Sequence, residues 1–142
     1  MSSKRKITAK WKGGMKFESD NPSGINVLID TQEKGSDKQF GLNPKGMMLS
    51  SLAGCTGIDI ISLLDKMKVE LDDFTMHVEG ELTDEHPKYF HKVSVDYHFY
   101  GSDLKKKKIE KEVNLYKDKY CGVMEMFRHF AEIKTQIHLH ES

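Results

Sequence analysis

The feature that most constrains the fold is a long apolar segment in the first half of the chain. Residues 47–64 contain one cysteine and one aspartate as their only ionisable groups. Asn43 before Pro44 is a typical helix N-cap followed by proline at the first helical position. The pattern predicts a helix that runs to about Met67 and has no polar face. A helix that is apolar on all sides must be buried on all sides, either in protein or in lipid.

Burial in protein fits this helix better than burial in lipid. Asp59 would cost about 2.5 to 3.5 kcal/mol in a bilayer, glycines and serines dilute the hydropathy, and the chain offers no second span. A helix of about 24 residues is about 36 Å long, which is roughly the diameter of a small domain. One chain of 142 residues can hardly enclose it. The sequence therefore predicts no membrane partner but an intertwined homodimer, in which strands of both protomers enclose two central helices.

Three short strands are expected before this helix, over residues 7–11, 15–18 and 26–30. A Gly-Gly pair and the segment Asp-Asn-Pro-Ser-Gly separate them, and both are strong turn sequences. The N-terminal part is therefore predicted to be a β meander.

Alternation with a period of two predicts three further strands after the helix. The turn at residues 84–87 joins the first two as an antiparallel pair, and two helices follow before the last strand. Ser102 or Asp103 can cap the first of these helices, and the second is expected after Cys121. The inward positions are Phe74, Met76, Val78 and Leu82 in the first strand, Val93, Val95, Tyr97 and Phe99 in the second, Ile109, Val113, Tyr116 and Tyr120 in the surface helix, and Ile133, Thr135, Ile137 and Leu139 in the last strand.

The element order is thus β-β-β-α-β-β-α-α-β, in one domain over residues 1–142. An α+β fold follows, with an antiparallel sheet wrapped around the long central helix.

The charge balance gives no support to a nucleic-acid partner, because 22 Lys and Arg match 22 Asp and Glu. The lysine run at 105–108 is expected to be a solvated helix face. The first thirty residues contain no secretory apolar region, so a cytoplasmic location is expected. His138 and His140 share one strand face, but two ligands are too few for a metal site.

The chemistry of the chain centres on two cysteines. Cys55 lies in the apolar helix among small residues that let a backbone or a substrate approach the sulfur, although a buried thiol can also be inert packing. Asp59 shares its helix face; when ionised it would raise the thiol pKa, and when protonated it could donate a hydrogen bond to the thiolate. Cys121 is expected at a helix start, where backbone amides would lower the pKa of its thiol.

Four motifs in order resemble the signatures of the OsmC/Ohr family of osmotically inducible and organic hydroperoxide resistance proteins. The resemblance covers about residues 5–140, and its most specific part is one cysteine in a central apolar helix and another after Lys-Tyr. The motifs are Asn43-Pro44 and the segments 52–56, 85–90 and 119–123.

The resemblance implies thiol-dependent reduction of organic hydroperoxides in oxidative stress defence. Cys55 would attack and become a sulfenic acid, Cys121 would resolve it as a disulfide, and an external dithiol would restore both thiols. The implied assembly is the intertwined homodimer, and no metal or organic cofactor is implied.

The chain departs from the family pattern next to the reactive thiol. Members with peroxidase activity carry a glutamate just after the proline that opens the central helix, paired with an arginine, whereas Lys45 and Gly46 follow Pro44 here. The two arginines are Arg5 and Arg128. Lys45 and Arg128 are candidate stand-in cations. These departures keep a second hypothesis open, a non-catalytic dimeric module that binds an apolar small molecule on the same scaffold.

Overall fold

The computed structural model describes residues 3–31 and 39–141. The predicted α+β class and the predicted element order are confirmed. The chain divides into two compact units, Met1–Met48 and Leu49–Ser142, which are described in turn.

The first unit contains the predicted meander. Strands β1 (Ala9–Trp11), β2 (Phe17–Ser19) and β3 (Val27–Ile29) form an antiparallel sheet in the order β1-β2-β3. Gly13, at φ 94°, makes the first turn possible, and its carbonyl accepts a hydrogen bond from the Lys16 N–H. The unit leaves many large apolar side chains exposed. They include Trp11, Met15, Phe17, Ile25, Leu28 and Phe40.

The long helix α1 (Pro44–Lys66) begins and ends as the sequence predicts, within one residue. The Gly46 N–H donates to Asn43 Oδ1 over 3.1 Å, which is the predicted N-cap. By length and composition α1 could cross a membrane. It is nevertheless a core helix, because one of its faces is buried in the second unit. The buried residues are Leu52, Thr56, Gly57, Ile60, Leu63 and Leu64.

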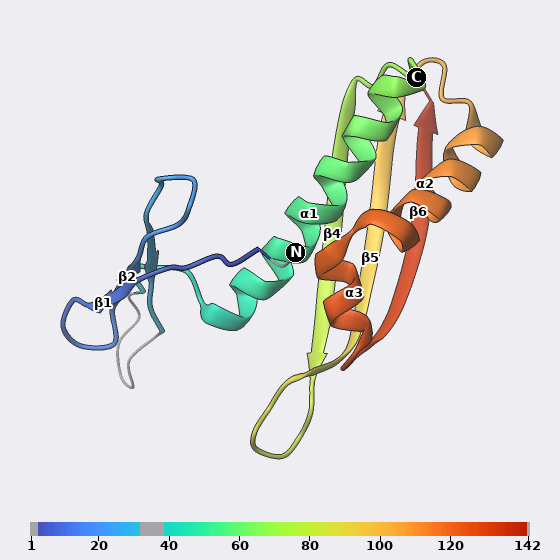
Figure 1. The fold of residues 1–142 in the computed structure, drawn as a ribbon. Helices are drawn as coiled ribbons and strands as arrows, with labels where there is room; N and C mark the ends of the chain where they lie inside the picture. Colours follow the sequence, from blue (N-terminus) through green and yellow to red (C-terminus); the bar gives the residue numbers. More distant parts are fainter. Residues whose placement is uncertain (1–2, 32–38, 142) are drawn as a thin grey trace. The chain divides into compact units, whose positions relative to one another are not determined.

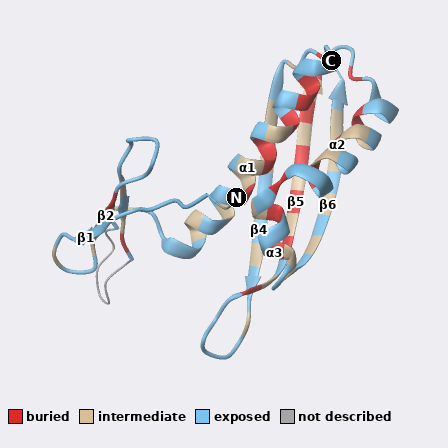
Figure 2. Cartoon of the chain, in the orientation of Figure 1, coloured by how far each residue is buried: buried red, intermediate tan, exposed pale blue. Residues whose placement is uncertain are grey.

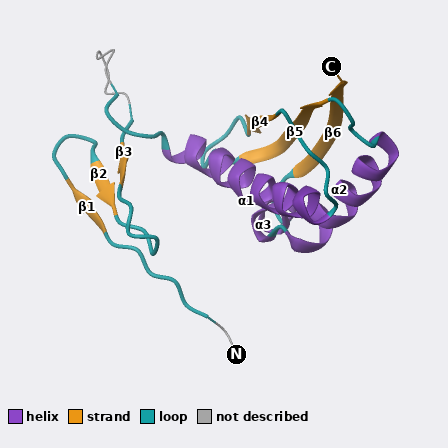
Figure 3. Cartoon of the chain, turned by 90° about the horizontal axis from the view of Figure 1, so that it is seen from above, coloured by secondary structure: helices purple, strands orange, loops and turns teal. Residues whose placement is uncertain are grey.

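The second unit is a three-stranded sheet with helices on one face (Figures 1 and 3). Strands β4 (Asp73–Leu82), β5 (Phe90–Gly101) and β6 (Glu132–Glu141) lie in the order β4-β5-β6. Helices α2 (Lys106–Tyr120) and α3 (Gly122–Arg128) connect β5 to β6.

The sheet is mixed, which corrects the predicted all-antiparallel sheet. Strands β4 and β5 are antiparallel as expected, but β6 pairs with β5 in parallel. The two helices between β5 and β6 return the chain to the starting end of β5, and a helical crossover of this kind produces parallel pairing.

The inward residues of β5 are buried as the alternation predicts (Figure 2). The prediction for Leu82 is wrong, because the β4–β5 register shifts between Glu81 and Leu82 and leaves Leu82 exposed. Gly80 takes the inward position instead, where Phe90 lies against it.

The predicted start and stripe of α2 also need correction. Its N-cap is Lys105, which makes no side-chain capping hydrogen bond, so neither Ser102 nor Asp103 caps the helix. Leu104 is buried in the core, which delays the helix start. Tyr120 is exposed, and Lys117 takes the inward place at the end of the stripe.

Candidate active site

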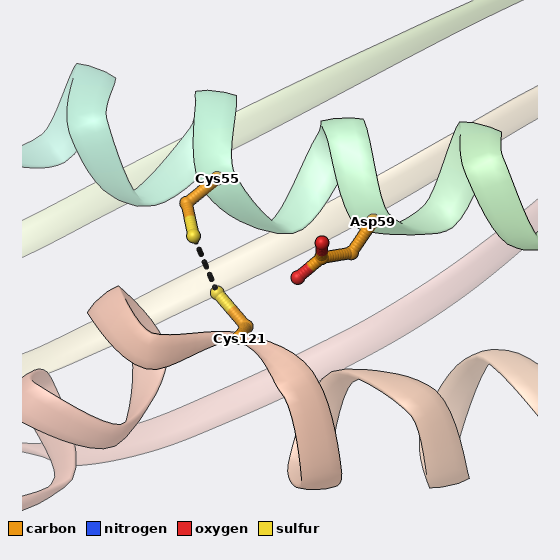
Figure 4. A group of neighbouring side chains, drawn as sticks. All are labelled: Cys55, Asp59 and Cys121. Carbon is orange, nitrogen blue, oxygen red and sulfur yellow. Dashed lines mark hydrogen bonds between the residues drawn. The ribbon is translucent and has the colours of Figure 1, made fainter. Parts of the chain in front are cut away.

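The structure brings the two cysteines together, although they are far apart in the sequence. Cys55 lies in the middle of α1 and Cys121 between α2 and α3, and their sulfurs are 3.3 Å apart (Figure 4). Both thiols are free, and the Cys121 S–H donates a hydrogen bond to Cys55 Sγ. The sequence predicts the residue types but not this distance.

The break between two helices positions Cys121. Its backbone is extended, with φ −81° and ψ 102°, so it ends α2 and is the N-cap of α3. Its sulfur accepts a hydrogen bond from the Met124 N–H over 3.4 Å, in the way that an N-cap side chain usually does. The cap therefore fixes the direction of the thiol.

Burial raises the pKa of Cys121 from 9.0 to about 11. The hydrogen bond to Cys55 and the charges of Cys55 and Asp59 act in the same direction, while the Met124 N–H opposes them. The Met124 amide lowers the pKa of this thiol, as expected for a helix start, but loss of water around the sulfur outweighs it and the net pKa is raised.

The two thiols differ in their exposure to solvent. Cys121 is only 2% exposed, whereas Cys55 is half-buried. A small molecule from solvent therefore reaches Cys55 first. The protonated Cys121 behind it is held in the position of a hydrogen-bond donor.

Asp59 lies one turn after Cys55, on the same helix face, as the sequence predicts. Its side chain points toward the two thiols (Figure 4). A carboxylate oxygen and both sulfurs lie within 4.8 Å of one another. Among the residues that the structure describes, Asp59 Oδ2 is buried and has no hydrogen-bond partner.

A buried hydrogen bond next to the thiols is not foreseen in the sequence. Thr56 Oγ1 and the Tyr97 hydroxyl are 3.1 Å apart, and both side chains are fully buried. Burial raises the pKa of Tyr97 to about 12, so the phenol is neutral. A tyrosine at an inward strand position signals that a polar partner is needed, but alternation does not identify that partner.

Arg128, one candidate stand-in cation, is held by acidic side chains: it is paired with Asp118 over 2.7 Å and with Glu125 over 3.6 Å. Lys45, the other candidate, is exposed in the first turn of α1 and belongs to the first unit.

An apolar hollow of about 590 Å³ lies along α1. Its walls come from α1 and β4, and neither cysteine lines it. Met76 packs against Gly57 there, in the space that a Cβ at this position would occupy. The lining residues are Ala53, Gly54, Gly57, Ile58, Ile61, Ser62, Asp65, Phe74 and Met76.

Comparison with known proteins places this geometry in a family. The family model described as OsmC-like protein matches residues 35–136. Protein YhfA of Escherichia coli is 29% identical over 124 residues, which cover 87% of this chain and 90% of that protein.

Solved structures share the whole fold. A hypothetical protein from Aquifex aeolicus has a TM-score of 0.86 at 23% identity, with 99% of each chain covered. An organic hydroperoxide resistance protein OsmC from Legionella pneumophila, also described as a predicted redox protein, has a TM-score of 0.68 at 19% identity, over 96% of this chain and 97% of that one.

Proposed function

Because the chain belongs to the OsmC-like protein family, we propose that it is a thiol-dependent peroxidase that reduces organic hydroperoxides. The observation that supports this most is the 3.3 Å distance between half-buried Cys55 and buried Cys121. The family includes organic hydroperoxide resistance proteins, which favours hydroperoxides as the substrate class. Cys55 is the attacking thiol and Cys121 the resolving thiol.

The first step is attack by the Cys55 thiolate on one peroxide oxygen. The S–O bond forms, the O–O bond breaks, and the alkoxide leaves and takes up a proton to become an alcohol. Cys55 is then a sulfenic acid. The sulfur has been oxidised by two electrons, and the hydroperoxide has been reduced by the same two.

The second step is attack by Cys121 on the Cys55 sulfur. The S–S bond forms, the S–O bond breaks, and the hydroxyl leaves with the Cys121 proton as water. The two steps together convert one hydroperoxide and two thiols into an alcohol, a disulfide and water. An external dithiol then reduces the disulfide by exchange, and Cys55 is the more accessible sulfur for it.

The hydrogen bonds at the site are consistent with Cys55 as the attacking thiol and Cys121 as the resolving thiol. Cys121 stays protonated because its pKa is raised, so it can donate to the Cys55 sulfur and stabilise negative charge there. When Cys121 becomes the nucleophile, the Met124 N–H stabilises its thiolate. Asp59 modulates both thiols through its charge.

The proposed assembly is the intertwined homodimer, in which the domain over residues 1–142 is completed by its partner. The face of α1 that borders the apolar hollow is uncovered in this chain, with Ile58 72% exposed and Ile61 45% exposed. A second copy of this face is the simplest cover. In such a dimer Lys45 of the partner is a candidate cation near Cys55.

Light scattering after size exclusion tests the assembly. At micromolar concentration the wild type is expected to have the mass of two chains, and Ile58→Glu to dissociate because it buries charge in the interface. A wild type with the mass of one chain would contradict the assembly.

Titration with cumene hydroperoxide tests the chemistry. In reduced protein, one equivalent of peroxide is expected to consume both thiols. Cys55→Ser should not react, and Cys121→Ser should stop at a sulfenic acid that a dimedone probe labels. Ser51→Ala, at an exposed position of the same helix and outside the lining of the hollow, is the matched control and should react as the wild type. If both thiols survive excess peroxide, or if Cys55→Ser reacts as fast as the wild type, the proposal is wrong.

The second candidate function is a non-catalytic module that binds an apolar small molecule. It is favoured by the apolar hollow between α1 and β4, which contains neither cysteine. Native mass spectrometry would detect a retained ligand. A bare protein together with rapid peroxide turnover would count against this candidate.

For the location of the protein, we propose the cytoplasm, where dithiol reductants are available.

A further inference from the structure

Three side chains with metal-binding chemistry converge at the boundary of α1 and α3. Cys55 and Asp59 come from α1 and Cys121 from the N-cap of α3 (Figure 4). One atom from each, two sulfurs and a carboxylate oxygen, lies within 4.8 Å of the other two. The spacing in the sequence places Cys55 and Asp59 on one helix face, and the fold adds Cys121 as the third potential ligand.

One oxygen of the Asp59 carboxylate lacks a hydrogen-bond partner among the described residues. Asp59 Oδ2 is buried without a hydrogen bond to any residue in 3–31 or 39–141. A buried carboxylate oxygen in this state is costly unless a cation or a donor satisfies it. Two basic residues of α2 and α3 do not serve this purpose, because Lys117 and Arg128 both pair with Asp118.

We propose that the reduced Cys55–Asp59–Cys121 cluster binds one thiophilic divalent cation, best matched by Zn²⁺. Two thiolates select zinc over magnesium or calcium, which prefer all-oxygen sites. Three protein ligands leave a fourth position for water, as in zinc sites that are not purely structural.

The distances suit a tetrahedral ion. With Zn–S bonds of about 2.3 Å and Zn–O bonds of about 2.1 Å, the two sulfurs would be about 3.8 Å apart and each sulfur about 3.6 Å from the oxygen. The sulfurs are 3.3 Å apart, and no ligand pair exceeds 4.8 Å. Small side-chain rotations therefore bring all three atoms into place.

Binding replaces the thiol protons with the metal. One Zn²⁺ and two thiols give a dithiolate complex and release two protons, while the carboxylate of Asp59 binds in its ionised form. Zinc affinity should therefore rise with pH, because protons compete with the metal for the two sulfurs.

The metal and the disulfide exclude each other, because both use the same two sulfurs. The site itself does not rest on the proposed peroxidase function, since it requires only reduced thiols and a carboxylate. One consequence does rest on that function: bound zinc should slow the reaction of Cys55 with hydroperoxides.

The outer face of the sheet is the competing location for a cation. His98 Nδ1 and His140 Nε2 are 3.0 Å apart there, and His138 is paired with Asp96 over 3.0 Å. Four imidazoles contact one another on this face, since His98 also lies against His77 and His138. Among the described residues, however, only Cys55, Asp59 and Cys121 present three ligand atoms within 4.8 Å of one another. His140→Ala is therefore the matched control.

The test is competition for Zn²⁺ between the full-length reduced protein and a chromophoric chelator, without oxygen. One equivalent per chain is expected to bind. Asp59→Asn, which keeps the shape but removes the charge, should weaken binding at least about tenfold. Cys121→Ser and the disulfide form should not retain the metal, and His140→Ala should bind as the wild type.

Substitution of Co²⁺ for Zn²⁺ gives a readout on the wild type that does not depend on any variant folding. Thiolate-to-cobalt charge-transfer bands and tetrahedral d–d bands are expected. Their absence, failure of the reduced wild type to hold zinc against the chelator, or unchanged affinity in Asp59→Asn would overturn the site. Loss of zinc binding in His140→Ala would show that the metal binds on the outer face of the sheet instead. Peroxide consumption by zinc-free protein is measured separately, so failure of either proposal is visible without the other.

Discussion

The buried thiol of Cys121 should make the protein less stable in alkaline solution. Its pKa is raised from 9.0 to about 11 in the folded state, chiefly by burial. Between these two values the unfolded chain loses the thiol proton while the folded chain keeps it. The contribution of this thiol to the free energy of unfolding is therefore fully present below pH 9.0. It falls as the pH rises and is lost above about pH 11.

The size of this loss follows from the same values. The rise from 9.0 to about 11 corresponds to about 3 kcal/mol, at about 1.4 kcal/mol for each tenfold change in proton affinity. Urea unfolding between pH 8 and 11, with a reductant present, measures it. Cys121→Ser removes the titrating group and keeps the shape, so the wild type should lose about 2 to 3 kcal/mol more than the variant. Parallel stability curves for the two proteins would refute the reasoning.

Two further predictions concern the packing around the site. Thr56→Val and Tyr97→Phe should each lower the free energy of unfolding in urea by about 1 to 2 kcal/mol. The double variant should lose less than the sum of the two, because both substitutions break the same buried hydrogen bond. Strictly additive losses would contradict that bond. Gly80→Ala places a Cβ 2.5 Å from the ring of Phe90, which is 6% exposed, and should lower the free energy of unfolding by about 1 to 3 kcal/mol. Gly122→Ala is the control, because it has open space around it and should be close to neutral in the same assay. Equal stability of the two alanine variants would count against the packing.

The long helix and the strand faces could be predicted because local signals specify them. The Asn43-Pro44 pair defines the start of α1, and alternation identifies the buried side of β5. Alternation does not encode strand direction, so it cannot predict the parallel pairing of β6 with β5. It also does not reveal a register shift, so it places Leu82 on the wrong face.

The candidate site was predictable in its residues but not in its electrostatics. The spacing of Cys55 and Asp59 places them on one helix face, as observed. The place of Cys121 at a helix start predicts a lowered pKa. The net pKa is raised, because burial removes water from the sulfur, and burial depends on contacts distant in sequence.

Cys55 and Cys121 are proposed to act as one redox pair. Peptide mapping by mass spectrometry, after one equivalent of cumene hydroperoxide has been added to fully reduced protein, tests this pairing directly. We predict a disulfide between the peptides that contain Cys55 and Cys121 of the same chain. A stable sulfenic acid or sulfinic acid at Cys55 with Cys121 still reduced, or a disulfide only between chains, would contradict the claim.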